Sequence, residues 1–468
     1  METIVRLQAL SIHNIKNVKY GKIVMPNTYK KHPSYKNAEV LGIYGQNGSG
    51  KTAVVDALYF IQRIMIGENL PIELADYMDA SEDEAEISAE FSIYIEESVY
   101  EVGYKICFQK VGKHGAMISR ETLTSTKITP EGRSSKTVFM EYTHGDSKTV
   151  FTPKKRFDEL ILENKEYKMD LLVAKKIAEK SNCSFIFGEN SLEIYKKPFE
   201  HSFKEYAVLI TSLHRFALTD LFVIRNTHSG VISANFVLPM AFKIEDTDQP
   251  GGGFKGDFAV SLNKPTVLSY EQKDMLHVIV NEINTVLCTI IPGLQMEVKE
   301  YGMQMLDNGR EGVKIELLSV REGVKIPIRM ESEGIIKIIS ILNALIQAFS
   351  DASICLVIDE LDAGVFEYML GELLDIFKKS ARGQLIFTSH NLRALEMLDK
   401  ESIMFSTVNP VNRYIHMKNI KSSNNLRDVY LRGITLGGHN DEIYAQTDSL
   451  KIARAFRKAG RSMRYDKK

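Results

Sequence analysis

The chain has 468 residues, well above an average domain of about 150 residues, so we expect two or three structural units. Hydrophobic residues make up 44% and charged residues 25%, which is typical of an ordinary soluble globular protein and argues against a disordered chain. The formal net charge of −1 gives, over the whole chain, no electrostatic case for binding nucleic acid or an anionic membrane.

Charge is unevenly distributed in two segments. Residues 68–101 contain twelve Asp or Glu and no Lys or Arg, whereas residues 451–468 contain eight Lys or Arg and one Asp. The first segment would repel phosphate and the second could attract it, but charge runs usually form a solvated surface without a partner. We interpret both as solvated surface first and keep nucleic acid open as a partner of the chain.

Neither a disulfide framework nor a cysteine metal site is expected. The four cysteines lie far apart in the sequence and show no CxxC spacing. The first 18 residues alternate polar and apolar types and lack the continuous apolar stretch of a signal peptide. No run of 18 or more apolar residues occurs, so we expect a cytoplasmic protein without a membrane segment.

The first elements predicted along the chain are strands that lead into a glycine loop and a helix. Residues 4–25 have the pattern of two strands broken near 14–17, and residues 40–44 form a third strand. The glycine loop follows, and residues 51–66 have the length and apolar spacing of a buried helix. Alternation over residues 86–111 predicts an antiparallel meander.

The middle of the chain, residues 156–300, is predicted to be a mostly helical insertion. Helical stretches occur within residues 159–180 and 199–222, and residues 270–291 have the pattern of another helix. The glycine stretch at residues 250–256 is either a linker or a moving loop, and its composition is compatible with both.

The last third returns to alternating strands and helices. We expect a strand at residues 354–358, a helix at 366–379 and a strand at 384–388. This alternation is typical of a mainly parallel sheet with helices on its faces. The predicted fold class is therefore α/β.

The strongest functional motif is GQNGSGKT at residues 45–52. It fits G-x-x-x-x-G-K-[ST] and lies between a predicted strand and a predicted helix, the context that this motif requires. Its glycines allow backbone N–H groups to surround phosphates, and the helix start adds positive potential. We expect Lys51 to reach the β and γ phosphates of ATP and Thr52 to ligate Mg²⁺. The predicted nucleotide-binding residues of this loop are Gly45, Asn47, Gly48, Ser49, Gly50, Lys51 and Thr52.

The second motif is ICLVIDELDAG at residues 354–364, in which apolar residues lead into Asp359 and Glu360. It places two carboxylates at the C-terminal edge of a buried strand, where open α/β sheets bind ligands. Asp359 suits Mg²⁺ as a hard oxygen ligand, and Glu360 would polarise the attacking water. The alternative, a strand that merely ends in two surface acids, does not explain the phosphate loop beside it.

In motif order and spacing the chain resembles the ABC ATPase superfamily, in particular the branch of the SMC heads, the RecF heads and the OLD-type ATPases. Leu361-Asp362 resembles the D-loop of that family, and a predicted strand ending in FTSHN, residues 387–391, follows it. His390 stands in the place of the switch histidine, which contacts the γ phosphate in that family. The resemblance implies that Asp362 takes part in nucleotide binding and that His390 is catalytic together with Glu360. Taken alone, His390 would be an ordinary capping or loop histidine.

The resemblance also implies a signature motif shortly before the Asp-Glu strand. The best candidate is ESEGIIKIISIL at residues 331–342, with Ser332 and Gly334 in the signature places and Glu333 instead of the usual glycine, as in OLD-like members. A hydroxyl and backbone N–H groups at a helix start form an anion site. In the family this site closes over the ATP of the other subunit, which implies a homo-oligomer with ATP at the subunit interface. The alternative is an ordinary helix capped by Ser332.

Two further features stay open. The Q-loop glutamine of the family is not identified, because Gln109 is poorly placed for that role. Residues 409–438 resemble the tail that follows the switch histidine in OLD-like defence ATPases. Three arginines in this segment could contact a partner or nucleotide, although structural or surface salt bridges are their more usual role: Arg413, Arg427 and Arg432.

The resemblance covers roughly residues 1–110 and 300–440 and implies a P-loop NTPase with an ABC ATPase-type head, in which a mainly parallel sheet accompanies an antiparallel meander. The predicted units are ATPase lobes at residues 1–155 and 301–420, the helical insertion at 156–300 and a basic C-terminal tail at 421–468.

The implied function is ATP hydrolysis that drives a switch or sensor, with ATP and Mg²⁺ as cofactors. OLD proteins continue into a Toprim nuclease domain, for which we expect no room after the ATPase here, so the closest analogy is the stand-alone ATPase subunit of two-component anti-phage systems such as PARIS, Septu or abortive-infection modules. A separate effector, either a nuclease or a toxin, and a phage-derived trigger are then expected partners.

The alternative function is that of a RecF-like DNA-binding repair ATPase, whose DNA affinity would fall steeply with salt. A P-loop kinase would share the phosphate loop but would not explain the Asp-Glu pair followed by a D-loop-like segment and a histidine.

Overall fold

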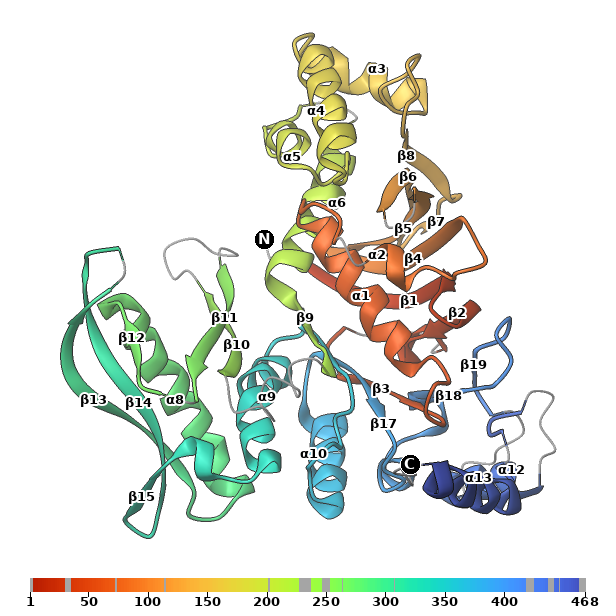
Figure 1. The fold of residues 1–468 in the computed structure, drawn as a ribbon. Helices are drawn as coiled ribbons and strands as arrows, with labels where there is room; N and C mark the ends of the chain where they lie inside the picture. Colours follow the sequence, from red (N-terminus) through yellow and green to blue (C-terminus); the bar gives the residue numbers. More distant parts are fainter. Residues whose placement is uncertain are drawn as a thin grey trace, which may run out of the picture.

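The computed structural model of the chain is an α/β structure in which a mainly parallel sheet lies next to an antiparallel sheet, with a further group of strands beside them (Figure 1). It describes residues 3–29, 35–71, 74–112, 115–200, 203–226, 237–245, 253–262, 264–306, 308–417, 425–436, 442–445 and 447–462.

The central sheet is built from short apolar strands that are buried on both faces. Its strand order is β19-β18-β3-β17-β16-β9, with β19 antiparallel to β18 and the other pairs parallel. Every residue of β3, β16, β17 and β18 is buried, as expected for strands covered by other layers. Because these strands are parallel, their carboxyl ends meet at one edge. The strands are β3 (Glu39–Tyr44), β9 (Leu221–Ile224), β16 (Cys355–Ile358), β17 (Gln384–Ser389), β18 (Ile403–Ser406) and β19 (Tyr414–Ile415).

The antiparallel sheet contains the predicted meander and extends beyond it. Its order is β2-β1-β4-β5-β6-β7, and β8 also pairs with β6. One face packs on a helix, so buried and less buried side chains alternate along β5. The strands are β1 (Ile4–Ile15), β2 (Val18–Val24), β4 (Glu84–Ile95), β5 (Ser98–Val111), β6 (Gly115–Thr129), β7 (Gly132–Arg133) and β8 (Thr137–Thr143).

Helices separate and cover the sheets. Helix α1 (Lys51–Met65) lies in the core that joins the antiparallel sheet to one face of the central sheet. Helices α9 (Glu333–Ser350) and α10 (Glu367–Ser380) pack in a second core on the opposite face. Helix α9 is long and apolar enough to cross a membrane, but 61% of that window is buried inside the molecule, as in a core helix of a globular protein.

The expectation of a mostly helical insertion over residues 156–300 is not confirmed. Helices fill its first part, and helix α8 agrees with the helix predicted at residues 270–291, but between them a π-helical turn leads into β9, which joins the central sheet beside β16. Strands dominate the remainder because residues 237–261 form a hairpin and later residues pair around β14. The helices are α3 (Lys154–Glu163), α4 (Tyr167–Ser181), α5 (Glu189–Tyr195), α6 (Lys204–Arg215) and α8 (Tyr270–Ile290); the strands are β10 (Val237–Glu245), β11 (Gly253–Ser261), β12 (Thr266–Leu268), β13 (Gln295–Met305), β14 (Glu311–Arg321) and β15 (Val324–Pro327).

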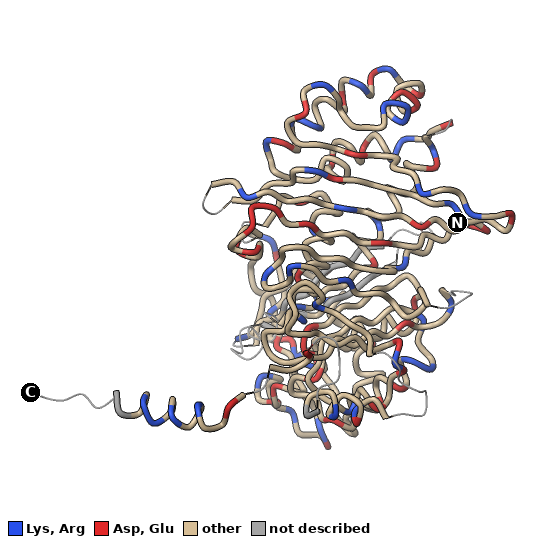
Figure 2. Tube along the Cα trace, turned by 90° about the vertical axis from the view of Figure 1, so that its right-hand side faces the viewer, with Lys and Arg blue, Asp and Glu red and all other residues tan. Residues whose placement is uncertain are grey.

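Two segments predicted from composition have a different structure. In the glycine stretch, Gly253–Gly256 begins strand β11 rather than forming a loop, and residues 250–252 lie outside the described residues. In the C-terminal region, helix α12 (Leu426–Leu436) packs on the core through Tyr430, whose ring stacks on Phe405, so this part is not a tail. Helix α13 (Ser449–Ser462) carries basic residues and projects from the body of the molecule (Figure 2).

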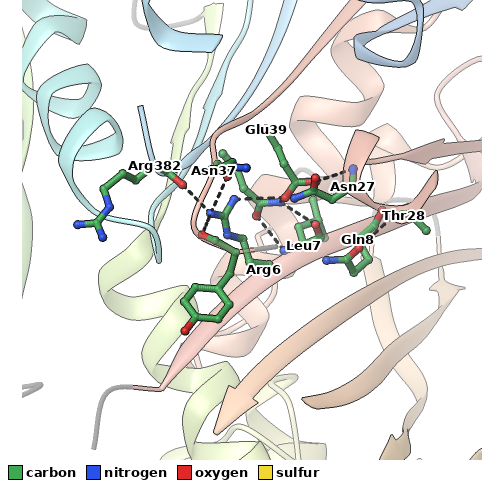
Figure 3. Close-up of polar contacts among 10 residues, drawn as sticks. Arg6, Leu7, Gln8, Asn27, Thr28, Asn37, Glu39 and Arg382 are labelled. Atoms are coloured by element: carbon green, nitrogen blue, oxygen red, sulfur yellow. Dashed lines mark hydrogen bonds and ion pairs between the residues drawn. The ribbon is translucent and has the colours of Figure 1, made fainter. Parts of the chain in front are cut away.

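A buried polar network joins the two sheets at the amino ends of β3 and β17. Arg6 of β1 forms an ion pair with Glu39 at 3.2 Å and donates to the carbonyl oxygens of Asn37, Tyr35 and Arg382 (Figure 3). Gln384 donates to Glu39 Oε2 at 2.8 Å and exchanges two hydrogen bonds with the backbone of β1. The backbone N–H of Asn27 donates to Glu39 Oε1, so both carboxylate oxygens have partners.

Candidate nucleotide site

The phosphate loop lies between the end of β3 and the start of α1, as the motif predicts. Gly48 and Gly50 have backbone φ angles of 75° and 90°, the left-handed region that favours glycine. Helix α1 begins at Lys51 with Gly50 as its cap residue and no side-chain cap. The first N–H groups of α1 therefore point to the loop without a capping oxygen, which is the arrangement that binds phosphate in proteins.

Lys51 is folded back over its own loop. Its side chain is buried, and Nζ donates to the carbonyl oxygens of Gly45 and Gln46, each at 3.0 Å. Burial lowers the pKa of Lys51, while the nearby carboxylates of Asp359, Glu360 and Asp362 act in the opposite direction and favour the charged form. Neutral carbonyls are weaker partners for an ammonium than phosphate oxygens, so an incoming triphosphate can replace them.

The loop is supported from outside by residues that sequence reasoning did not assign to the site. Asn17 donates to the carbonyl oxygen of Gly48, and the Tyr414 hydroxyl donates to that of Gly50 at 2.7 Å. Arg413 is buried and donates to the carbonyl oxygens of Thr407 and Asn17. Tyr414 lies within residues 409–438, and the resemblance of this segment to the tail of OLD-like ATPases was the sequence signal that could have pointed to it.

The other two arginines of that segment lie away from the loop. Arg427 forms a salt bridge with Glu396 at 2.9 Å, and Arg432 is exposed on α12. Arg413 and Arg427 thus have the structural roles that are usual for arginines in such a segment.

Thr52 and Asp359 are the residues that could hold a magnesium ion. Thr52 Oγ1 lies 3.5 Å from Asp359 Oδ1, which also accepts a hydrogen bond from Thr388 at 2.6 Å. Asp359 is 2% exposed, yet its Oδ2 has no hydrogen-bond partner among the residues that the structure describes. A buried carboxylate oxygen without a partner is costly unless a cation or donor completes it. Mg²⁺ in nucleotide sites is commonly bound by one or two protein oxygens together with phosphate and water oxygens, a ligand set to which Thr52 and Asp359 could contribute.

Glu360 directly follows Asp359 and is held in an unusual backbone conformation. Its φ of 50° lies in the left-handed region, which is uncommon for a residue with a side chain. Its N–H donates to Thr388 Oγ1 at 2.8 Å, and its Oε2 accepts from Asn226 Nδ2 at 2.9 Å. These hydrogen bonds maintain the disfavoured backbone conformation and hold the Glu360 carboxylate at the edge of the sheet.

Asn226 is a site residue that the sequence did not indicate. It follows β9, which pairs in parallel with β16, so the ends of both strands lie side by side. Gln109 was the weak candidate for the Q-loop glutamine of the family. It is exposed on β5 and pairs with Glu84 and Met117 of the antiparallel sheet. Residues 199–222 had a helical pattern, and this concealed the short strand that positions Asn226.

His390 and Asp362 lie together at the ends of β17 and β16. The backbone N–H of His390 donates to Asp362 Oδ2 at 3.0 Å, whereas within the described part of the chain Asp362 Oδ1 has no hydrogen-bond partner. Partial burial and the Lys51 ammonium lower the pKa of His390, while the nearby carboxylates act in the opposite direction; the lowered pKa favours the neutral imidazole, which carries one N–H donor.

The candidate signature residues stand at the start of α9. Ser332 is exposed and caps the helix, with its Oγ accepting from Ile335 N at 3.4 Å. Gly334 is packed so closely on Gly364 that a Cβ would overlap the Gly364 carbonyl oxygen. The segment after Glu360 and the start of α9 are therefore in direct contact within one chain.

The predicted residues fall into two groups. Lys51, Thr52, Asp359 and Glu360 meet at the carboxyl edge of the central sheet, with Asp362 and His390 beside them. In the loop itself Ser49 bonds to Gln46 O at 2.7 Å, whereas Asn47 is exposed. Ser332 and Gly334 belong to the second group, at the α9 start.

No protein-family model and no curated protein sequence matches the chain. Among solved structures, it is similar to an Smc head domain bound to the C-terminal domain of ScpA from Pyrococcus furiosus, at 13% identity and a TM-score of 0.38, covering 88% of this chain and 96% of that chain. It is also similar to the SMC head domain from Thermotoga maritima, at 12% identity and a TM-score of 0.34, covering 88% and 99%. For the recombination mediator protein RecF with ATP the values are 13%, 0.34, 83% and 92%. Because these identities and TM-scores are low, the function is inferred below from the geometry of the chain's own residues.

Proposed function

We propose that the chain is a Mg²⁺-dependent ATPase of the ABC type that binds ATP at the carboxyl edge of its central sheet. The observation that carries this proposal is the convergence of a phosphate loop with two carboxylates, in which Thr52 Oγ1 lies 3.5 Å from the buried Asp359. If the phosphate loop and the Asp359-Glu360 pair had unrelated roles on the surface, they would not need to lie next to each other. Cytoplasmic localisation remains part of the proposal.

Each residue at this edge has a chemical role in ATP hydrolysis. Lys51 exchanges its loop carbonyls for β and γ phosphate oxygens, and Thr52 with Asp359 would hold Mg²⁺. When bound, the ion neutralises charge on the phosphates as the bond to the leaving group breaks. Glu360 orients the attacking water and accepts its proton, while Asn226 restrains the same carboxylate. Neutral His390 offers an N–H to the γ phosphate.

A second copy of the chain would complete the site. Ser332 is exposed at the start of an 18-residue helix, where its hydroxyl and free N–H groups can bind an anion. If this helix start contacts the γ phosphate of another subunit, ATP binds the assembled state more tightly than the separated state. ATP binding then joins two copies, and hydrolysis releases them.

Two single variants test the catalytic assignment. Lys51→Ala removes the phosphate cation and is expected to weaken ATP binding. Glu360→Gln keeps the shape of the site but removes the base, so we expect ATP binding to persist and turnover to fall about 100-fold or more, with accumulation of the closed oligomer. Turnover and equilibrium binding measured on the same preparations separate the two effects. Hydrolysis by Glu360→Gln at the unmodified rate would exclude this role of Glu360.

A mixture of variants tests whether the site is shared. Lys51→Ala and Ser332→Arg are each expected to be inactive as homodimers. In a mixed dimer, the Ser332→Arg subunit keeps its own phosphate loop and receives an intact helix start from its partner. Half of the dimers in an equimolar mixture are mixed and each has one complete site, so activity should return, up to about a quarter of the unmodified rate. An absence of recovery would show that one subunit is sufficient.

We further propose that this cycle controls a separate effector, a nuclease or toxin, in defence against phage. The support is the resemblance of residues 409–438 to the tail of OLD-like defence ATPases. Cells carrying the gene with its neighbours should restrict plaque formation, and the Lys51→Ala variant should not. Equal plaque counts for the two strains would contradict the defence role.

A RecF-like DNA-binding function is the second candidate, and helix α13 is the observation that favours it. Four cations of this helix are exposed, and the helix contains no Asp or Glu. If it contacts DNA phosphates, log K should fall with log salt, with a slope that decreases by about 0.9 for each contact removed. Replacing its exposed cations by Gln should flatten this slope, whereas Phe456→Ser on the apolar side should not. The four cations are Lys451, Arg454, Arg457 and Lys458.

A further inference from the structure

Lys337, in the second turn of α9, is a buried cation that the roles above do not use. It is 6% exposed, and its Nζ donates to the backbone carbonyl oxygen of Glu360. Asp362, Glu360 and Asp359 favour its charged form, against a burial effect that lowers its pKa. An ammonium in such a place is stabilised only while these partners stay near it.

The bond from Lys337 is one of four hydrogen bonds to Glu360, whose carbonyl oxygen also accepts from the nearby backbone N–H of Ala363 at 3.0 Å, and the other three come from distant segments. Thr388 of β17 accepts from the N–H of Glu360, Asn226 after β9 donates to its carboxylate, and Lys337 of α9 donates to its carbonyl oxygen. The left-handed backbone of Glu360 is disfavoured relative to an ordinary conformation, because its Cβ lies too close to the following carbonyl oxygen. The carbonyl bond fixes the orientation of the peptide that follows Glu360, and so opposes relaxation of this conformation.

The same helix carries the candidate anion site. Ser332 caps α9, Gly334 is in close contact with Gly364, and Lys337 follows within five residues of the cap. Most residues of α9 after Gly334 are buried in the core, so this helix moves as a rigid unit. A displacement of its exposed start therefore displaces the Lys337 ammonium relative to Glu360.

We propose that Lys337 is a positioning residue that couples the helix start at Ser332 to Glu360 of the same subunit. The inference rests on the proposed function, in which Ser332 binds the ATP of the partner subunit. The partner's ATP would then set the position of Glu360 for the subunit's own ATP, and the two sites of a dimer become coupled. Hydrolysis should be cooperative in ATP for this reason.

Lys337→Met, which keeps the length and apolar stem of the side chain, tests the positioning role. We expect its ATP affinity to stay within about twofold of the unmodified value, its kcat to fall about ten-fold, equivalent to about 1.4 kcal/mol, and the Hill coefficient of hydrolysis to fall to the value that ATP-driven dimerisation alone gives. Lys337→Arg keeps a cation and should recover much of the kcat and of the Hill coefficient. A kcat within twofold of the unmodified protein, or an unchanged Hill coefficient, overturns the assignment. Loss of ATP binding in both variants would indicate a structural role and would overturn it as well.

Mixing experiments determine in which subunit Lys337 acts. Combined with Lys51→Ala, Lys337→Met should show no recovery, because the one subunit with an intact phosphate loop also holds the unsupported Glu360. The matched control is Ser332→Arg with Lys51→Ala, whose one complete site has no ATP in the partner subunit and should therefore recover at the ten-fold lower kcat of an uncoupled site. Recovery with Lys337→Met would mean that Lys337 acts on the partner's site, contrary to the inference. Failure of the control alone would overturn the shared site, while the kcat of Lys337→Met with retained binding would still decide the positioning role.

Discussion

The two edges of the central sheet differ in how their carboxylates are paired. At the amino edge, both oxygens of the buried Glu39 carboxylate accept hydrogen bonds, from Arg6, Gln384 and the N–H of Asn27. At the carboxyl edge, one oxygen each of Asp359 and Asp362 accepts no hydrogen bond from any residue in the described ranges. The backbone at Glu360 is also left-handed.

This difference separates stability from function. Closed networks stabilise the fold, because removal of one member leaves a buried group unpaired. Open groups of like charge destabilise the fold, and they persist where a ligand completes them. Variants at the two edges should therefore affect different measurements.

The largest effect is expected at the amino edge. Arg6→Met leaves the buried Glu39 carboxylate without its cation, which should lower the free energy of unfolding by about 3–5 kcal/mol. Denaturant titration measures this loss. The double variant Arg6→Met with Glu39→Met should regain a large part of it, since an apolar pair leaves no buried charge. At low temperature the kcat of the folded single variant should stay near the unmodified value. A loss of kcat without a loss of stability would contradict the assignment of the amino edge to stability.

An intermediate effect is expected at the carboxyl edge. Thr388→Val removes the hydroxyl that donates to Asp359 and accepts from Glu360 N–H. We expect kcat to fall about ten-fold and the free energy of unfolding to fall by only about 1–2 kcal/mol, because one N–H loses its partner. Steady-state kinetics over a range of Mg²⁺ concentrations measures the first effect. Thr388→Ser keeps the hydroxyl and serves as the control. A stability loss equal to that of Arg6→Met would contradict the separation of roles.

The smallest effect is expected behind the phosphate loop. Tyr414→Phe removes one hydrogen bond to Gly50 O and keeps the ring that packs on Gly21. A neutral hydrogen bond contributes about 1 kcal/mol, so ATP affinity should weaken by only a few-fold. Titration with ATP measures this change, and thermal unfolding should move little. A complete loss of binding would mean that Tyr414 contacts the nucleotide itself.

The sequence was sufficient for the local elements of the site. Strand, glycine loop and helix at residues 40–66 follow from apolar spacing and from the glycine positions, and β3 and α1 agree with this prediction within a few residues. The strand before Asp359 and the strand before His390 were likewise readable, because buried parallel strands are short apolar runs.

The middle of the chain was the main failure of prediction. Residues 221–224 are too few to show a strand period, and they directly follow a helix and a π-helical turn. Their pairing with β16, more than a hundred residues later, is a contact between distant segments that no local pattern contains. Asn226 was missed for the same reason.

Motif chemistry was determined by the sequence alone, because the loop glycines, Lys51 and the Asp359-Glu360 pair are local features with specific spacings. Only the tertiary structure decided which distant groups surround them: Lys337 on Glu360, Asn226 on the same carboxylate and Tyr414 on the loop. The physical reason is that hydrogen bonds between remote segments depend on how the strands are ordered in the sheet. Strand order results from packing of the whole chain rather than from the pattern of any one segment.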